Sequence, residues 1–154
     1  MCCSVLVACE TYEDATPVDV SFQTKASRNI KGYSQVPVTS LIMKNGSQSK
    51  LTGVPCELKG SGFKAKLVTP AMVNVPVYGM ATRSLLVTCT YGEETVSKTL
   101  LPVNLTEVKA ANTGFAVGGL LGVLIVASAV NSRQNKDMDE YGYNPAPMVF
   151  GKPK

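Results

Sequence analysis

Apolar and polar residues alternate along much of this chain with a period of two. In residues 63–67, three apolar side chains alternate with Lys64 and Lys66, as in a strand with one face buried and one face in water. Similar short segments recur between turn residues such as Asn45 and Gly46. The predicted strands are residues 36–43, 54–59, 63–67, 72–77, 84–91 and 95–105, and residues 18–22 form either an edge strand or a tethered arm.

Short strands at this spacing predict a mainly β chain built as a small antiparallel β-sandwich. The strands that pack together are expected to lie within residues 36–106. Pro102 is expected to bend the last strand or to place it at a sheet edge, because proline has no N–H for the ladder.

A different pattern follows the predicted sandwich. Residues 110–132 carry no charge, and Gly114, Gly118 and Gly122 recur at every fourth position. On a helix this spacing places the glycines on one face, where another backbone can approach closely. As a helix the run would be about 35 Å long, against about 30 Å of hydrocarbon in a bilayer. We expect one glycine-rich apolar helix at 107–132, which either enters a membrane or is buried in the protein or in an oligomer.

Composition excludes several function classes. At 154 residues with a net charge of +4, the chain has room for one ordinary domain, and its 15 basic residues are scattered. This distribution argues against a nucleic-acid interface. The chain contains no His and no Trp, so the commonest general base and metal ligand are missing. Asp137, Asp139 and Glu140 are interpreted as a solvated charge cluster. We expect no enzyme, metal, cofactor or small-molecule substrate.

Two of the five cysteines, Cys56 and Cys89, fall in predicted strands of the body. In an oxidising compartment they are expected to form a disulfide worth about 3–4 kcal/mol, and otherwise they are two buried thiols.

The N-terminus resembles a bacterial lipobox. Leu6, Val7 and Ala8 precede Cys9, whose thiol would accept the lipid, and Glu10 follows it. The absence of Asp after the cysteine favours the outer membrane. Residues 1–8 lack Lys and Arg and are shorter than a secretory signal. We interpret them as a signal-peptide remnant, and the alternative is a cysteine-rich end without a role.

A series of motifs follows in order between residues 54 and 145. The motifs are Cys56-Glu57-Leu58, a glycine-rich turn with Phe63, Thr69-Pro70 with Val73 and Val75, Leu86-Val87-Thr88-Cys89, the glycine run and Tyr141-Gly142-Tyr143-Asn144-Pro145. This order resembles that of small Gram-negative envelope lipoproteins with a PEGA-like β domain and a glycine-rich C-terminal segment. The resemblance implies an architecture and indicates no activity.

These patterns divide the chain into a signal-peptide remnant (1–8), a polar tether (9–35), a β-sandwich (36–106), the glycine-rich helix (107–132) and an extended tail (133–154). The tail is either a partner-binding segment or a disordered end. The function expected is that of a non-enzymatic envelope lipoprotein, in the outer membrane facing the periplasm. It would act as a structural or assembly component, bound to membrane lipid and to copies of itself or to an envelope complex. The alternatives are a single-pass inner-membrane protein with a periplasmic β domain and an oligomeric soluble or virion β protein.

Overall fold

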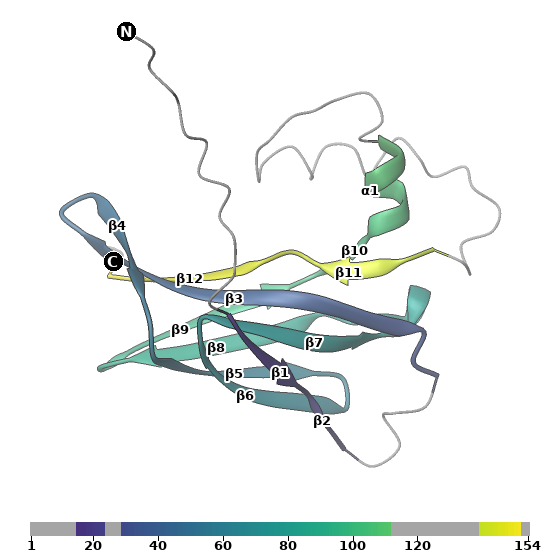
Figure 1. The fold of residues 1–154 in the computed structure, drawn as a ribbon, viewed down its shortest axis with the longest axis horizontal. Helices are drawn as coiled ribbons and strands as arrows, with labels where there is room; N and C mark the ends of the chain where they lie inside the picture. Colours follow the sequence, from purple (N-terminus) through teal and green to yellow (C-terminus); the bar gives the residue numbers. More distant parts are fainter. Residues whose placement is uncertain (1–14, 24–28, 112–138, 152–154) are drawn as a thin grey trace, which may run out of the picture.

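Two β-sheets are stacked face to face in this computed structural model, which describes residues 15–23, 29–111 and 139–151 (Figure 1). The first sheet, sheet A, contains β1 (Thr16–Asp19), β3 (Gly32–Lys44), β4 (Ser47–Leu51), β7 (Ala71–Val77) and β12 (Ala146–Phe150). The second, sheet B, has the order β2 (Ser21–Phe22), β6 (Phe63–Thr69), β5 (Val54–Gly60), β8 (Leu85–Tyr91) and β9 (Glu94–Leu100). The mainly β prediction and the sandwich are confirmed.

The predicted alternation is visible in the burial of the strands. Along β6, from Phe63 to Thr69, buried and exposed residues alternate without exception. The β3–β4 hairpin turns at Asn45 and Gly46, which have φ angles of 51° and 78°. Positive φ at both central residues is what a tight hairpin turn requires, so Asn-Gly at this point is explained by its backbone.

The core lies between the inner faces of the two sheets. Its largest fully buried apolar side chains are Phe150, Leu58, Leu85 and Met148. One buried polar contact joins the sheets: the Thr69 hydroxyl of sheet B donates to the Ser40 Oγ of sheet A at 2.8 Å. Both polar groups thereby have a partner, which removes most of the cost of burying them.

The sandwich is larger than the predicted limits of 36–106. The expected tether contributes β1, which pairs with β7, and β2, which pairs with β6. The expected tail contributes β12, which runs beside β3 (Figure 1) and places Phe150 and Met148 in the core. The β1–β7 and β12–β3 pairs are parallel, whereas the remaining ladders are antiparallel. Parallel pairing needs long connections, which these distant segments have.

The predicted last strand, 95–105, is divided between two sheets. β9 pairs with β8, and after the exposed Leu101 the chain continues as β10 (Pro102–Asn104), which pairs with β11 (Tyr141–Tyr143). The strand is therefore interrupted at Leu101, and Pro102 begins the next strand in a two-stranded sheet, where each strand is an edge strand. The short helix α1 (Leu105–Ala111) follows at once, and the Asn104 side chain accepts the N–H groups of Thr106 and Glu107 at its start.

α1 overlaps only the first residues of the predicted helix at 107–132. The rest of that segment lies outside the described residues, so the glycine-rich helix is not supported and stays a prediction. In the part of the chain that the structure describes, no helix has the length and apolar character needed to cross a membrane.

Tyr143 fixes β11 to the sandwich. Its side chain is buried, and its hydroxyl donates to the Arg83 carbonyl at 2.6 Å. Burial, with a smaller effect of Tyr78, raises the pKa of Tyr143 to about 12. The folded protein therefore favours the neutral phenol.

The first prediction concerns the C-terminal strand. Phe150→Ala should lower the free energy of unfolding by about 3–5 kcal/mol, because it leaves a cavity in the core. Val149→Ala, on the half-buried opposite face of β12, should cost much less. Urea unfolding measures both. If Phe150→Ala unfolded at the wild-type midpoint, β12 would not be part of the cooperative fold.

The second prediction concerns pH. Above pH 10 the unfolded chain loses the Tyr143 proton that the folded chain retains up to about pH 12. The free energy of unfolding should therefore fall as pH rises through this window, by roughly 1.4 kcal/mol from this group at pH 11. In Tyr143→Phe that part of the fall should disappear, as measured by urea unfolding at neutral pH and at about pH 11. Equal falls in both proteins would contradict the assignment.

Candidate interaction surface

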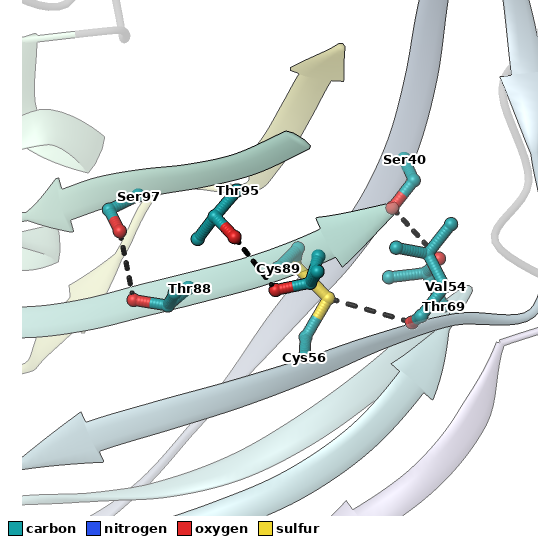
Figure 2. Close-up of a disulfide and its surroundings, with 9 residues drawn as sticks. Ser40, Val54, Cys56, Thr69, Thr88, Cys89, Thr95 and Ser97 are labelled. Atoms are coloured by element: carbon teal, nitrogen blue, oxygen red, sulfur yellow. Dashed lines mark hydrogen bonds between the residues drawn. A yellow bond between two sulfur atoms is a disulfide. The ribbon is translucent and has the colours of Figure 1, made fainter. Parts of the chain in front are cut away.

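Cys56 and Cys89 form a disulfide between β5 and β8 (Figure 2). They lie directly opposite each other in the antiparallel ladder, with their Cα atoms 4.1 Å apart. Adjacent strands bring opposite side chains close enough for such a bond without displacing the backbone. The sequence left open whether these cysteines form a disulfide or remain two buried thiols, and the structure contains the disulfide.

The disulfide is a structural bond of the core. Cys89 is fully buried and Cys56 is nearly so. The bond cross-links two neighbouring strands near the middle of sheet B and closes a loop with a sequence separation of 33. Because it is shielded from solvent, it is not placed for exchange with other thiols.

Cys9 and the helix-packing glycines Gly114, Gly118 and Gly122 lie outside the described residues. No group of three or more potential metal ligands occurs among the residues that the structure describes.

The interpretation of the acidic cluster as solvated is wrong for Asp139. Its side chain is only 8% exposed, and it accepts a hydrogen bond from the Asn104 amide at 2.7 Å. The next residue, Glu140, accepts the Leu105 N–H at 2.7 Å through its backbone carbonyl. These contacts hold the start of β11 against the start of α1, so the Asp139 carboxylate has a structural task.

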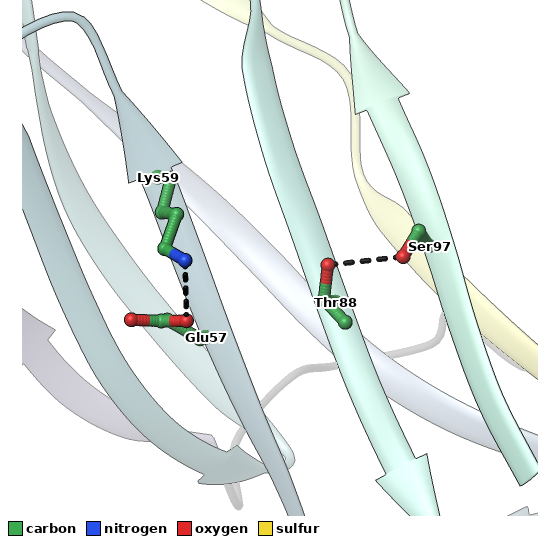
Figure 3. A network of polar contacts seen from close by, with 4 residues as sticks. All are labelled: Glu57, Lys59, Thr88 and Ser97. Atoms are coloured by element: carbon green, nitrogen blue, oxygen red, sulfur yellow. Dashed lines mark hydrogen bonds and ion pairs between the residues drawn. The ribbon is translucent and has the colours of Figure 1, made fainter.

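The outer face of sheet B carries a group of charged side chains. We call Glu57, Lys59, Lys64 and Lys66 the lysine face. In the β5–β6 ladder, Lys59 lies opposite Lys64 and Glu57 lies opposite Lys66. The Lys59 Nζ is 2.9 Å from Glu57 Oε2 (Figure 3). The three lysines outnumber the one carboxylate, so this face is positive.

The charges act on Glu57 together. The hydrogen bond from Lys59 lowers the pKa of Glu57, and the charges of Lys59, Lys64 and Lys66 act in the same direction. Because the side chains of Lys59 and Glu57 are 58% and 35% exposed, the ion pair contributes little to stability. Its effect is to fix two of the four charges in place on the sheet.

Hydroxyl groups continue the same outer face beyond the lysines. Thr88 of β8 and Ser97 of β9 are 3.0 Å apart between their oxygens, and Thr90 and Thr95 are 3.1 Å apart (Figures 2 and 3). Each pair sits directly opposite across the β8–β9 ladder. These cross-strand pairs place four hydroxyl groups on the outer face next to the lysine face.

A shallow depression of about 460 Å³ lies at one end of this face. Lys59 and Arg83 supply positive charge to it, and its other lining residues are Gly60, Ser61, Ser84, Leu85, Leu86 and Thr99. Cations and hydroxyls suit the binding of an anionic group. Apolar surface is also present on this side of the sheet, where Val68 is 55% and Leu86 is 42% exposed.

The sequence pattern predicted only part of this surface. The alternation in residues 63–67 identified Lys64 and Lys66 as solvent-facing. Their position beside Glu57 and Lys59 depends on the register between β5 and β6, which the alternation does not give.

The third prediction concerns the disulfide. Replacing both cysteines, as Cys56→Val with Cys89→Val, should lower the free energy of unfolding by about 3–4 kcal/mol, because the cross-link restricts the unfolded chain. Urea unfolding with and without reductant measures this. In reductant the wild-type midpoint should fall to that of the variant. If the variant unfolded at the midpoint of the oxidised wild type, the disulfide would not stabilise the fold.

Comparisons with family models, curated proteins and solved structures gave no match to this chain. Its function is therefore argued from its own residues.

Proposed function

We propose that this protein is a lipid-anchored component of the bacterial cell envelope that acts by binding rather than by catalysis. The observation that carries the proposal is the buried Cys56–Cys89 disulfide at the centre of sheet B. Disulfides of this kind form and persist in oxidising compartments such as the periplasm. The bridge therefore supports export from the cytoplasm.

The anchor in this proposal is a lipid on Cys9. Small and aliphatic residues precede this cysteine as in a lipobox, and a polar segment follows it. The first described strand, β1, begins soon afterwards at Thr16. A lipid on Cys9 would hold the sandwich close to the membrane that carries it, in our proposal the outer membrane with the sandwich in the periplasm.

The role proposed for the sandwich is to present surfaces. The outer face of sheet B combines a positive cluster, hydroxyl pairs and exposed apolar side chains. The repeated glycines Gly114, Gly118 and Gly122 would supply a second contact, between copies of the chain or with an envelope complex. In a structural or assembly function, the outer face of sheet B and the glycine-rich segment would each bind a different partner surface.

The fourth prediction tests the anchor. The chain, expressed from its native locus with the upstream sequence, should be recovered from detergent-solubilised membranes with everything before Cys9 removed. Its intact mass should also include a diacylglycerol and an acyl group. Cys9→Ser should abolish both changes, because serine cannot form the thioether. Cys3→Ser is the matched control and should leave the mature mass unchanged.

Two outcomes would contradict the proposal. An unprocessed, unlipidated wild-type chain that stays in the membrane would leave the glycine-rich segment as the anchor. A Cys9→Ser variant whose mature mass differs from that of the wild type only by the exchange of sulfur for oxygen would place the modification elsewhere.

A further inference from the structure

We propose that the outer face of sheet B docks on an anionic lipid bilayer surface. The cross-strand order of charges is the first argument. Lys59 and Lys64 stand directly opposite each other on β5 and β6, and like charges in this position are unfavourable unless a counter-charge is near. Glu57 offsets only one of three lysines, so an anionic surface would complete the charge balance.

The second argument is the chemistry of the surrounding side chains. Lys64 and Lys66 are exposed on the outer side of β6, and exposed Val68 and Leu86 lie on the same side. Lysine combines an apolar stem with a charged head. Lys59 and Arg83, with the hydroxyls of the depression, can bind a headgroup phosphate. A bilayer surface offers anionic headgroups above an apolar layer. On this face the cations would contact the headgroups, and exposed Val68 and Leu86 would contact the apolar layer.

The third argument is the place where the chain enters the sandwich, and it rests on the proposed function. The Thr16 N–H donates to the Pro70 carbonyl at 3.2 Å, immediately after the end of β6. The chain between Cys9 and Thr16 can span at most about 25 Å. A lipid on Cys9 would thus keep strand β6, with Val68, Lys66 and Lys64 on its outer face, within reach of the bilayer.

The opposite side of the sandwich lacks this combination. The outer side of sheet A carries an Asp19 carboxylate that accepts a hydrogen bond from the Asn74 amide at 2.8 Å. Two described lysines lie in its β3–β4 hairpin, where Lys44 is opposite Ser47 and Lys50 is opposite Leu41. Among the described residues, sheet B thus groups three lysines on two adjacent strands, whereas the two hairpin lysines of sheet A occupy separate positions of their ladder.

The fifth prediction tests this docking with the full chain carrying Cys9→Ser, so that no lipid on Cys9 contributes. Binding is measured by co-sedimentation with phosphatidylcholine vesicles that contain or lack phosphatidylglycerol. Adding Lys64→Gln and Lys66→Gln should weaken binding to the anionic vesicles roughly 10- to 30-fold, as expected for two lysines at a charged membrane surface. Binding to the zwitterionic vesicles should not change.

The matched control is Lys44→Gln with Lys50→Gln, which removes two exposed lysines from the β3–β4 hairpin. It changes the net charge equally and should weaken binding less than about threefold. The segment at 110–132 is the same in all variants, so differences between them report on the described surface. Raising the salt concentration should remove the preference for anionic vesicles.

Three results would overturn the docking proposal. One is an equal loss in the lysine-face and control variants, which would indicate a net-charge effect alone. Another is equal binding to both kinds of vesicle. The third is binding of soluble polyglutamate, lost in Lys64→Gln with Lys66→Gln, together with no binding to anionic vesicles, which would indicate an acidic protein partner. If the native chain is lipidated on Cys9 while these assays fail, the anchor stands and the docking face does not.

Discussion

The two sheets depend on each other because neither can bury its apolar face alone. Each strand places alternate side chains on the inner face of its sheet. The two inner faces pack into a core whose largest fully buried side chains are Phe150, Leu58 and Leu85. The apolar surface removed from water there is the main source of stability. The Cys56–Cys89 bridge and the Ser40–Thr69 hydrogen bond act inside this arrangement, one within sheet B and one between the sheets.

The same alternation determines what reaches the surface. If one side of β6 is buried, Lys64 and Lys66 must point outward, and the ladder with β5 sets them beside Glu57 and Lys59. The packing of the core therefore determines which positions of sheet B face solvent. It does not determine which polar residues occupy those positions. Nothing in the core requires lysine at these positions, since threonine and serine occupy the equivalent places on β8 and β9.

Segments from both sides of the central run of strands complete the two sheets. β1 and β2 extend one edge of each sheet, and β12 covers the other side of β3. Tyr143 and Asp139 fix the segment that leads into β12 through contacts with Arg83 and Asn104. A fold that needs its terminal strands in this way cannot be limited to the uninterrupted run of strands in the middle of the sequence.

The sequence by itself left the pairing of Cys56 and Cys89 open, and the register between β5 and β8 decided it. It determined the strands of the middle, the Asn45–Gly46 turn and the break in the last strand beside Pro102. Each of these follows from local chemistry: side-chain alternation, φ preference or a missing N–H. It did not determine that residues 139–151 join the core or that Asp139 is buried. Short segments with Pro and Gly have weak local signals, and their structure is chosen by partners far away in the chain. The lysine face likewise required the register between β5 and β6, which only the packed sheets fix.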